Sequence, residues 1–95
     1  MSILVRPALS ADAPQLAQWA KAMAWETERI TLPDQDIFPG VRRAIEQSGL
    51  AQYFIAELAG RPAGCLMLTY EWSDWRNGLW WWIQSVYVDP GCRRQ

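Results

Sequence analysis

The chain has 95 residues, 51% hydrophobic and 20% charged, a composition that argues against disorder and fits one small globular domain spanning residues 1–95. A formal net charge of −1 gives no general attraction to nucleic acid, and no apolar run reaches the roughly 18 residues of a membrane span. The sequence has no histidine and only two cysteines, which nearly excludes a zinc site and a disulfide scaffold. Because no signal pattern opens the chain, we expect a cytoplasmic protein.

The first half of the chain has the pattern of one strand followed by two helices. Residues 3–5 are a short apolar run before Arg6-Pro7, which predicts a strand that stops before the proline. Apolar residues at helical spacing then predict a helix that begins near Ser10 or Asp12 and ends near Trp25; they are Leu16, Trp19, Ala20 and Met23. A second helix is predicted from Asp34 to Ser48-Gly49.

The second half changes to the period of strands. Residues 53–58 and 63–70 are rich in strand formers and flank the turn Gly60-Arg61-Pro62, which predicts a hairpin. A second turn region, residues 72–78, ends in Asn77-Gly78 and leads into a third strand over residues 79–88. The predicted fold class is therefore α+β: strand, helix, helix and then a three-strand antiparallel meander.

The last predicted strand contains the run Trp80-Trp81-Trp82. Since side chains alternate along a strand, Trp80 and Trp82 should point to one face and Trp81 to the other. We expect these rings in the core and in an interface, and we favour this over a tryptophan platform for a ligand such as a sugar. An open strand edge beside such rings also favours assembly with another chain.

Carboxylates close to the predicted turns are the candidate acid–base groups. Glu26 and Glu28 follow the first predicted helix, and Glu71 and Asp74 precede the last strand. The lack of histidine excludes a Cys–His or a Ser–His–Asp nucleophile within this chain. Basic residues at the end, Arg93-Arg94, are placed where a phosphate could meet the start of a helix.

The sequence resembles the N-terminal part of the GNAT superfamily, the acetyl-CoA-dependent N-acetyltransferases. The resemblance rests on residues 3–8, 10–16, 53–57 and 61–66, and it is strongest in Gln84-Ser85-Val86-Tyr87-Val88-Asp89-Pro90 followed by Arg93-Arg94-Gln95. It covers the whole chain but only about the first two-thirds of the family's fold. It implies a GNAT-like domain without the C-terminal helix and strands, so residues 1–95 are expected to be a single, incomplete domain.

The resemblance also implies a cofactor path. Arg93, Arg94 and Gln95 match the first three positions of the family's Q/R-x-x-G-x-G/A signature, whose backbone N–H groups hold the pyrophosphate of acetyl-CoA. The backbone at Val86, Tyr87 and Val88 should pair with the pantetheine arm, and one N–H there should polarise the thioester carbonyl. The amine should lie near Glu26, Glu28, Glu71 and Asp74, with Gln84 on the strand able to hold a water.

Two functions remain open from the sequence. In the first, the completed protein transfers an acetyl group from acetyl-CoA to a primary amine of a small substrate without any metal, and the 95-residue chain alone is expected to be inactive. In the second, the chain is a non-catalytic assembly fragment, working through its strand edge and its tryptophan-rich surface as a homodimer or with its missing C-terminal half as partner.

Overall fold

The computed structural model describes residues 3–47 and 49–93. A first strand and two helices are followed by three strands, and short 3₁₀ helices stand before α1 and after β4. This order confirms the predicted α+β fold class. The elements are β1 (Ile3–Pro7), η1 (Ser10–Asp12), α1 (Ala13–Glu28), α2 (Asp34–Glu46), β2 (Gln52–Leu58), β3 (Arg61–Ser73), β4 (Gly78–Val88) and η2 (Pro90–Cys92).

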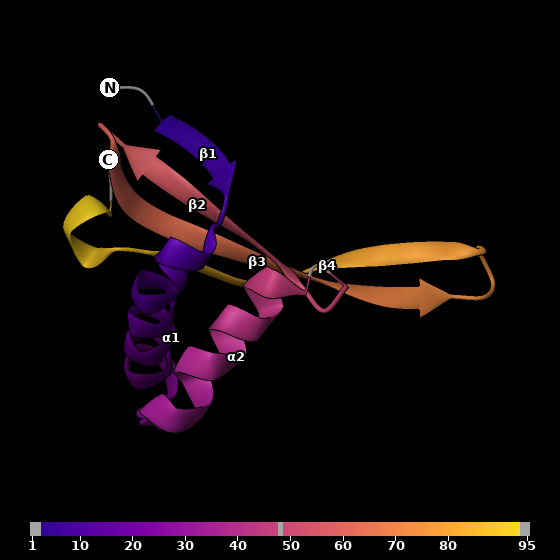
Figure 1. Cartoon of the computed structure of the whole chain (residues 1–95), viewed down its shortest axis with the longest axis horizontal. Helices are drawn as coiled ribbons and strands as arrows, with labels where there is room; N and C mark the ends of the chain where they lie inside the picture. Colours follow the sequence, from indigo (N-terminus) through magenta and orange to yellow (C-terminus); the bar gives the residue numbers. More distant parts are fainter. Residues whose placement is uncertain (1–2, 48, 94–95) are drawn as a thin grey trace.

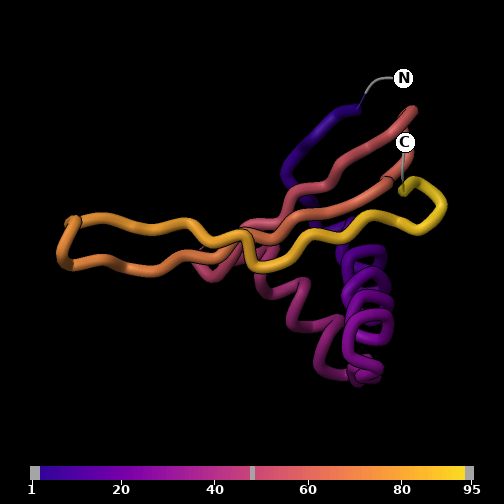
Figure 2. Tube along the Cα trace, turned by 180° about the vertical axis from the view of Figure 1, so that it is seen from behind, coloured from indigo at the N-terminus to yellow at the C-terminus, as the bar shows by residue number. Residues whose placement is uncertain are grey.

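The four strands form one antiparallel sheet in the order β1-β2-β3-β4, so that β4 is an edge strand. Both helices lie on the same side of this sheet (Figure 1). The hairpin of β3 and β4 is much longer than the other strands and projects past the helices, as Figure 2 shows from behind. The longest dimension of the molecule, 43 Å, therefore reflects the hairpin as well as the packed body.

Helix α1 continues past its predicted end at Trp25 to Glu28. It closes at Arg29, which has a left-handed φ of 55° and whose N–H donates to the Trp25 carbonyl at 3.0 Å. The next N–H, of Ile30, donates to the Ala24 carbonyl at 3.2 Å. This arrangement satisfies the last carbonyls without a glycine, so the sequence carried no clear stop signal.

The core lies between the two helices and one face of the sheet. The predicted apolar face of α1 is confirmed, because Leu16 and Trp19 are buried at 2% and 4% exposure. They pack with Val41 of α2, Ile55 of β2 and Tyr87 of β4. A period-3.6 stripe on α1 thus meets a period-2 face of the sheet.

The opposite face of the sheet is not covered by any helix within residues 3–47 and 49–93. Ile55 and Tyr87 face the helices, and side chains alternate along each strand. The alternate residues, including Val5, Val86 and Val88, therefore face the other way, and they are 62%, 58% and 40% exposed. This leaves an apolar surface of the kind that usually contacts another element or partner.

Strand β4 carries a bulge next to the middle of the sheet. Met67 of β3 pairs with Ser85, whereas Leu68 pairs with Ile83, so Gln84 has no opposite residue. A bulge bends its strand and increases the local twist, and it re-aims the side chain that it inserts. The bulge therefore separates the part of β4 that packs on the helices from the part in the projecting hairpin.

The predicted alternation of the three consecutive tryptophans is confirmed, but their predicted place in the core is wrong. Trp80 and Trp82 line one groove, and Trp81 packs on the opposite face against Tyr70, with ring centroids 5.6 Å apart. All three rings are between 45% and 58% exposed. The physical reason is the length of the hairpin, which carries this part of β4 beyond the reach of α1 and α2.

Gly64 is the position where the β3–β4 pairing leaves least room. A Cβ built there would lie 2.7 Å from the Tyr87 carbonyl oxygen, closer than real contacts allow. We expect Gly64→Ala to lower the free energy of unfolding by about 1–3 kcal/mol, because the backbone has to shift. The matched control is Gly40→Ala in α2, where nothing lies within 4 Å and helix propensity should add roughly 0.5–1 kcal/mol. Urea unfolding followed by circular dichroism measures both, and equal stabilities for the two variants would contradict the expectation.

Candidate active site at the edge of β4

The outer edge of β4 carries backbone groups that point away from the sheet. The Asp89 N–H donates to the Ala63 carbonyl at 2.8 Å, so the N–H groups two and four residues earlier, at Tyr87 and Ser85, also face β3. Those of Val86 and Val88 therefore face outward. Arg93 supports this alternation, because its Nε donates to the Val88 carbonyl at 2.9 Å from outside the sheet.

Three side chains join the end of α1 to this edge. The Tyr87 hydroxyl donates to Glu26 Oε2 at 2.5 Å, and the Arg93 guanidinium donates to Glu26 Oε1 at 2.8 Å. The guanidinium also lies over the Tyr87 ring, 5.2 Å from its centroid. An open groove of about 360 Å³ runs past them, and its lining residues are Met23, Glu26, Thr27, Val86, Tyr87, Val88 and Arg93.

The charges in this cluster are fixed by its hydrogen bonds. The hydrogen bond from Tyr87, and then that from Arg93, lower the pKa of Glu26. Burial of the ring, and then the bond to Glu26, raise the pKa of Tyr87. At neutral pH Glu26 is therefore a carboxylate and Tyr87 a neutral phenol, which is the pair of states that this geometry requires.

The Glu26 contacts should add stability only above acidic pH. Because the folded pKa of Glu26 lies below its ordinary value of 4.5, this stabilisation is present at neutral pH and is lost as the pH falls through the lowered value. We expect Glu26→Gln to melt at a lower temperature than the original chain at neutral pH. The difference should shrink towards zero in strong acid, where both side chains are uncharged. Thermal melts across pH measure it, and a difference that stays constant would argue against the contacts.

A second anchor holds the segment that leaves β4. Trp19 Nε1 of α1 donates to Asp89 Oδ2 at 3.3 Å, while Asp89 Oδ1 accepts from the Gly91 N–H at 2.9 Å. Asp89 thus starts the turn η2 and ties it to the core helix. Sequence reasoning did not single out Asp89; the signal was its place directly after a strand and before Pro-Gly.

The other candidate carboxylates lie along the projecting hairpin. Glu71 of β3 and Asp74 in its turn line an open groove of about 430 Å³ with Trp80 and Trp82. Gln84 stands between this groove and the edge described above, and its Oε1 accepts from the Thr69 hydroxyl at 3.4 Å. The structure thus brings Glu71 and Asp74 together but leaves them on a different part of β4 from the Glu26 cluster.

The remaining candidates are placed as follows. Glu28 is the exposed last residue of α1. Arg94 and Gln95 lie outside the described residues, so of the predicted basic segment only Arg93 has a described position. Residues 3–47 and 49–93 contain no group of three or more histidine, cysteine, aspartate or glutamate side chains placed to hold a metal ion. In the same part of the chain, no helix is long and apolar enough to cross a membrane.

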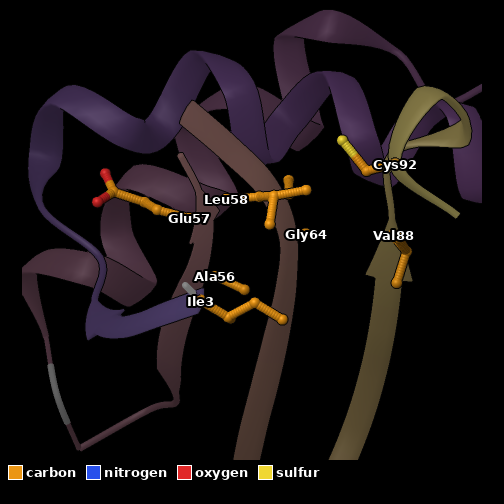
Figure 3. Close-up of a pocket in the computed structure, with 8 residues that line it drawn as sticks. Ile3, Ala56, Glu57, Leu58, Gly64, Val88 and Cys92 are labelled. Atoms are coloured by element: carbon orange, nitrogen blue, oxygen red, sulfur yellow. The ribbon is translucent and has the colours of Figure 1, made fainter. Parts of the chain in front are cut away.

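A further hollow of about 260 Å³ lies on the sheet face away from the helices (Figure 3). Side chains from β1, β2 and β4 and from the η2 turn surround it, and its lining is mostly apolar. It does not include any of the candidate carboxylates Glu26, Glu28, Glu71 and Asp74. The residues drawn and labelled in Figure 3 are Ile3, Ala56, Glu57, Leu58, Gly64, Val88 and Cys92.

Comparison with known proteins gives one family and many solved structures of the same architecture. The model of the acetyltransferase (GNAT) family matches residues 12–95. A protein of Clostridium difficile 630, described as a possible acetyltransferase, is 36% identical with a TM-score of 0.94, and the alignment covers 100% of this chain and 62% of that protein. This chain thus spans less than two-thirds of the length of that relative. A comparison with curated proteins gave no match.

Two more distant structures share the fold. An integron cassette protein from the mobile metagenome of Cole Harbour Salt Marsh is 21% identical, with a TM-score of 0.85 over 96% of this chain and 59% of its own. A protein from Clostridium acetobutylicum, described as a predicted acetyltransferase and solved with acetyl-CoA, is also 21% identical. Its TM-score is 0.70 over 99% of this chain and 64% of its own.

Proposed function

Because the chain belongs to the acetyltransferase (GNAT) family, we propose that it supplies the acetyl-CoA-binding edge of an enzyme that acetylates a primary amine. The observation that carries this proposal is the open edge of β4. The outward backbone groups of Val86 and Val88 lie beside a fixed cation, Arg93. An extended amide-containing molecule can pair with such an edge as an added strand, and its anionic end can meet the cation.

The pantetheine arm of acetyl-CoA has the amide groups that this edge would bind. It would run along Val86, Tyr87 and Val88, and the pyrophosphate would lie towards Arg93, with Arg94 and Gln95 following in the chain. The solved structure of the Clostridium acetobutylicum protein with acetyl-CoA supports this choice of co-substrate. Tyr87 itself is turned inward to Glu26, so its contribution to the edge is through the backbone.

The reaction needs a neutral amine, an acyl donor and stabilisation of an oxyanion. Acetyl-CoA supplies the thioester when it is bound. The amine nitrogen forms a bond to the carbonyl carbon, the carbon–sulfur bond breaks, and the proton lost by the amine balances the charge of the departing thiolate. We assign the outward N–H of Val86 to the developing oxyanion, since it is the first outward N–H after the bulge at Gln84.

The candidate side chains divide into two roles in this proposal. Glu26 is held ionised by Tyr87 and Arg93, so it positions the arginine rather than carrying the amine's proton. Glu71 and Asp74 are exposed carboxylates that would attract the protonated amine, and Gln84 would hold a water through which the proton leaves. Glu28, at the exposed end of α1, is the remaining carboxylate able to approach an amine from that side.

The direct test is acetyl transfer by a completed protein. The chain can be joined to the part of the Clostridium difficile protein that the alignment does not cover. Incubation with acetyl-CoA and a panel of primary amines should release free thiol and give N-acetylated product, both detected by mass spectrometry. Folded chimera that binds neither acetyl-CoA nor releases thiol with any amine would contradict the proposed function.

A second candidate function, assembly through the sheet, has its own supporting observation. Apolar side chains of β1 and β4 are exposed on the uncovered face, among them Ile3, Val5 and Val86. A second copy of the chain, in the cytoplasm that we propose as its location, would find both an open edge and an apolar surface there. Light scattering on the purified chain decides this point, because a monomer over a wide concentration range would rule it out.

A further inference from the structure

The part of the β3–β4 hairpin beyond the helices has a groove that combines indole rings with carboxylates. It holds about 430 Å³, and its lining is acidic and aromatic, without a lysine or an arginine: Glu71, Trp72, Ser73, Asp74, Trp75, Trp80 and Trp82. Trp75 is 93% exposed, although large apolar rings are normally withdrawn from water. Rings and carboxylates of this kind together attract organic cations, because the ring faces are electron-rich and the carboxylates are negative.

The carboxylates of this groove are prepared for a cation that the chain does not itself supply. No ion pair among residues 3–47 and 49–93 includes Glu71 or Asp74. Glu71 Oε1 accepts from Trp82 Nε1 at 2.7 Å, which fixes the carboxylate beside the indole without neutralising its charge. A fixed, uncompensated carboxylate against an aromatic ring is a good partner for an ammonium or guanidinium group.

The chain itself shows that a ring of this groove accepts a cation. The guanidinium carbon of Arg76 lies 4.9 Å from the centroid of the Trp80 ring, within the range of a cation–π contact. Arg76 belongs to the hairpin turn and is exposed, so a ligand cation can replace it or stack on a neighbouring ring. This contact is independent of the carboxylates and points to the same class of ligand.

We infer that this groove binds a cationic group of the acceptor, which therefore carries a second ammonium or guanidinium besides the amine that is acetylated. This inference rests on the proposed function for the position of the reacting amine, near Val86 on the same strand. Four residues of strand separate Trp82 from Val86, which is roughly 10–13 Å at about 3.3 Å per residue with allowance for the bulge. The acceptor class is thus an elongated amine with two cationic ends about that far apart.

Binding to the groove can be measured on the chain without acetyl-CoA. Spermidine is the polycationic probe, and tetraethylene glycol is a neutral chain of similar flexibility. We expect spermidine to quench tryptophan fluorescence and to shift the Trp82 indole N–H resonance, with an affinity that falls as salt is added. Tetraethylene glycol and neutral sugars should leave both signals unchanged. Quenching by sugars but not by spermidine would overturn the inference in favour of a carbohydrate platform.

Paired variants separate this groove from general stickiness of the hairpin. Trp82→Leu should weaken spermidine binding by roughly five- to thirtyfold, the usual range of a cation–π contact. Glu71→Gln should weaken it as well, with little effect left at high salt. The matched controls are Trp81→Leu, on the opposite face, and Glu46→Gln at the end of α2, and both should bind as the original chain does. Circular dichroism confirms that each variant is folded, and equal losses in Trp82→Leu and Trp81→Leu would overturn the inference.

The two proposals can fail separately. Acetyl transfer to a simple monoamine by the completed protein, together with no spermidine binding to the groove, leaves the proposed function standing and overturns the inference. Spermidine binding with the expected loss in Trp82→Leu, but no acetyl transfer to any amine, supports a cation site and overturns the proposed function instead.

Discussion

Replacing Val86 by proline is expected to lower acetyl transfer by the completed protein about 100- to 1,000-fold, the usual loss when one oxyanion donor is removed. Proline has no backbone N–H, and the N–H of Val86 faces away from β3. The substitution therefore removes the proposed donor without removing a hydrogen bond of the sheet. Edge strands accept proline where the N–H faces outward, so the fold should survive. Thiol release under saturating acetyl-CoA gives the rate.

Val86→Ala is the matched control for this result. It shortens the same exposed side chain but keeps the backbone N–H, so its rate should stay close to that of the original protein. Tyr87→Pro provides the opposite control, because its N–H faces β3 and its loss should destabilise the sheet. If Val86→Pro is folded and as fast as Val86→Ala, the oxyanion donor lies elsewhere.

Trp19→Ala is expected to lower the free energy of unfolding by about 3–5 kcal/mol, which is the usual cost of truncating a buried aromatic side chain. Trp19 is 4% exposed, packs against Tyr87 with ring centroids 6.4 Å apart, and donates to Asp89. Small domains have about 5–15 kcal/mol of stability in total, so this variant should be partly unfolded at 37 °C. Urea unfolding followed by far-ultraviolet circular dichroism measures the loss.

Two comparisons show whether packing or the hydrogen bond dominates in this variant. Trp25→Ala removes an indole that is 51% exposed on the same helix, and it should cost far less. Trp19→Phe keeps most of the packing but loses the bond to Asp89, so it should fall between the two. Equal losses in Trp19→Ala and Trp25→Ala would contradict the position of Trp19 in the core.

The main elements of the fold could be predicted because their signals are local. The helical spacing of Leu16 and Trp19, the turn Gly60-Arg61-Pro62 and the pair Asn77-Gly78 each depend on neighbouring residues. The ends of elements were less predictable. Helix α1 ends at a non-glycine residue in the left-handed conformation, and such a cap leaves no composition signal. The hairpin was longer than predicted, since its outer pairs are held by strand pairing alone.

The candidate site was predictable in its residues but not in its contacts. The resemblance pointed to Val86–Val88 and Arg93, and the carboxylates were visible as charges near turns. Which carboxylate meets which partner depends on tertiary packing: Glu26 and Tyr87 are far apart in the sequence and meet only when α1 lies on the sheet. The exposure of the tryptophans was mispredicted for a similar reason, because ring size alone does not tell whether a helix reaches that part of a strand.

The central claim, that the open edge of β4 pairs with acetyl-CoA, is tested most directly by amide resonances. Nitrogen-15-labelled chimera, in which this chain is joined to the uncovered part of the Clostridium difficile protein, is titrated with acetyl-CoA. The account predicts that the amides of Val86 and Val88 shift and become protected from hydrogen exchange, while that of Ser85, already bonded to β3, changes least. Binding of acetyl-CoA that leaves the Val86 and Val88 amides unshifted and unprotected would contradict it.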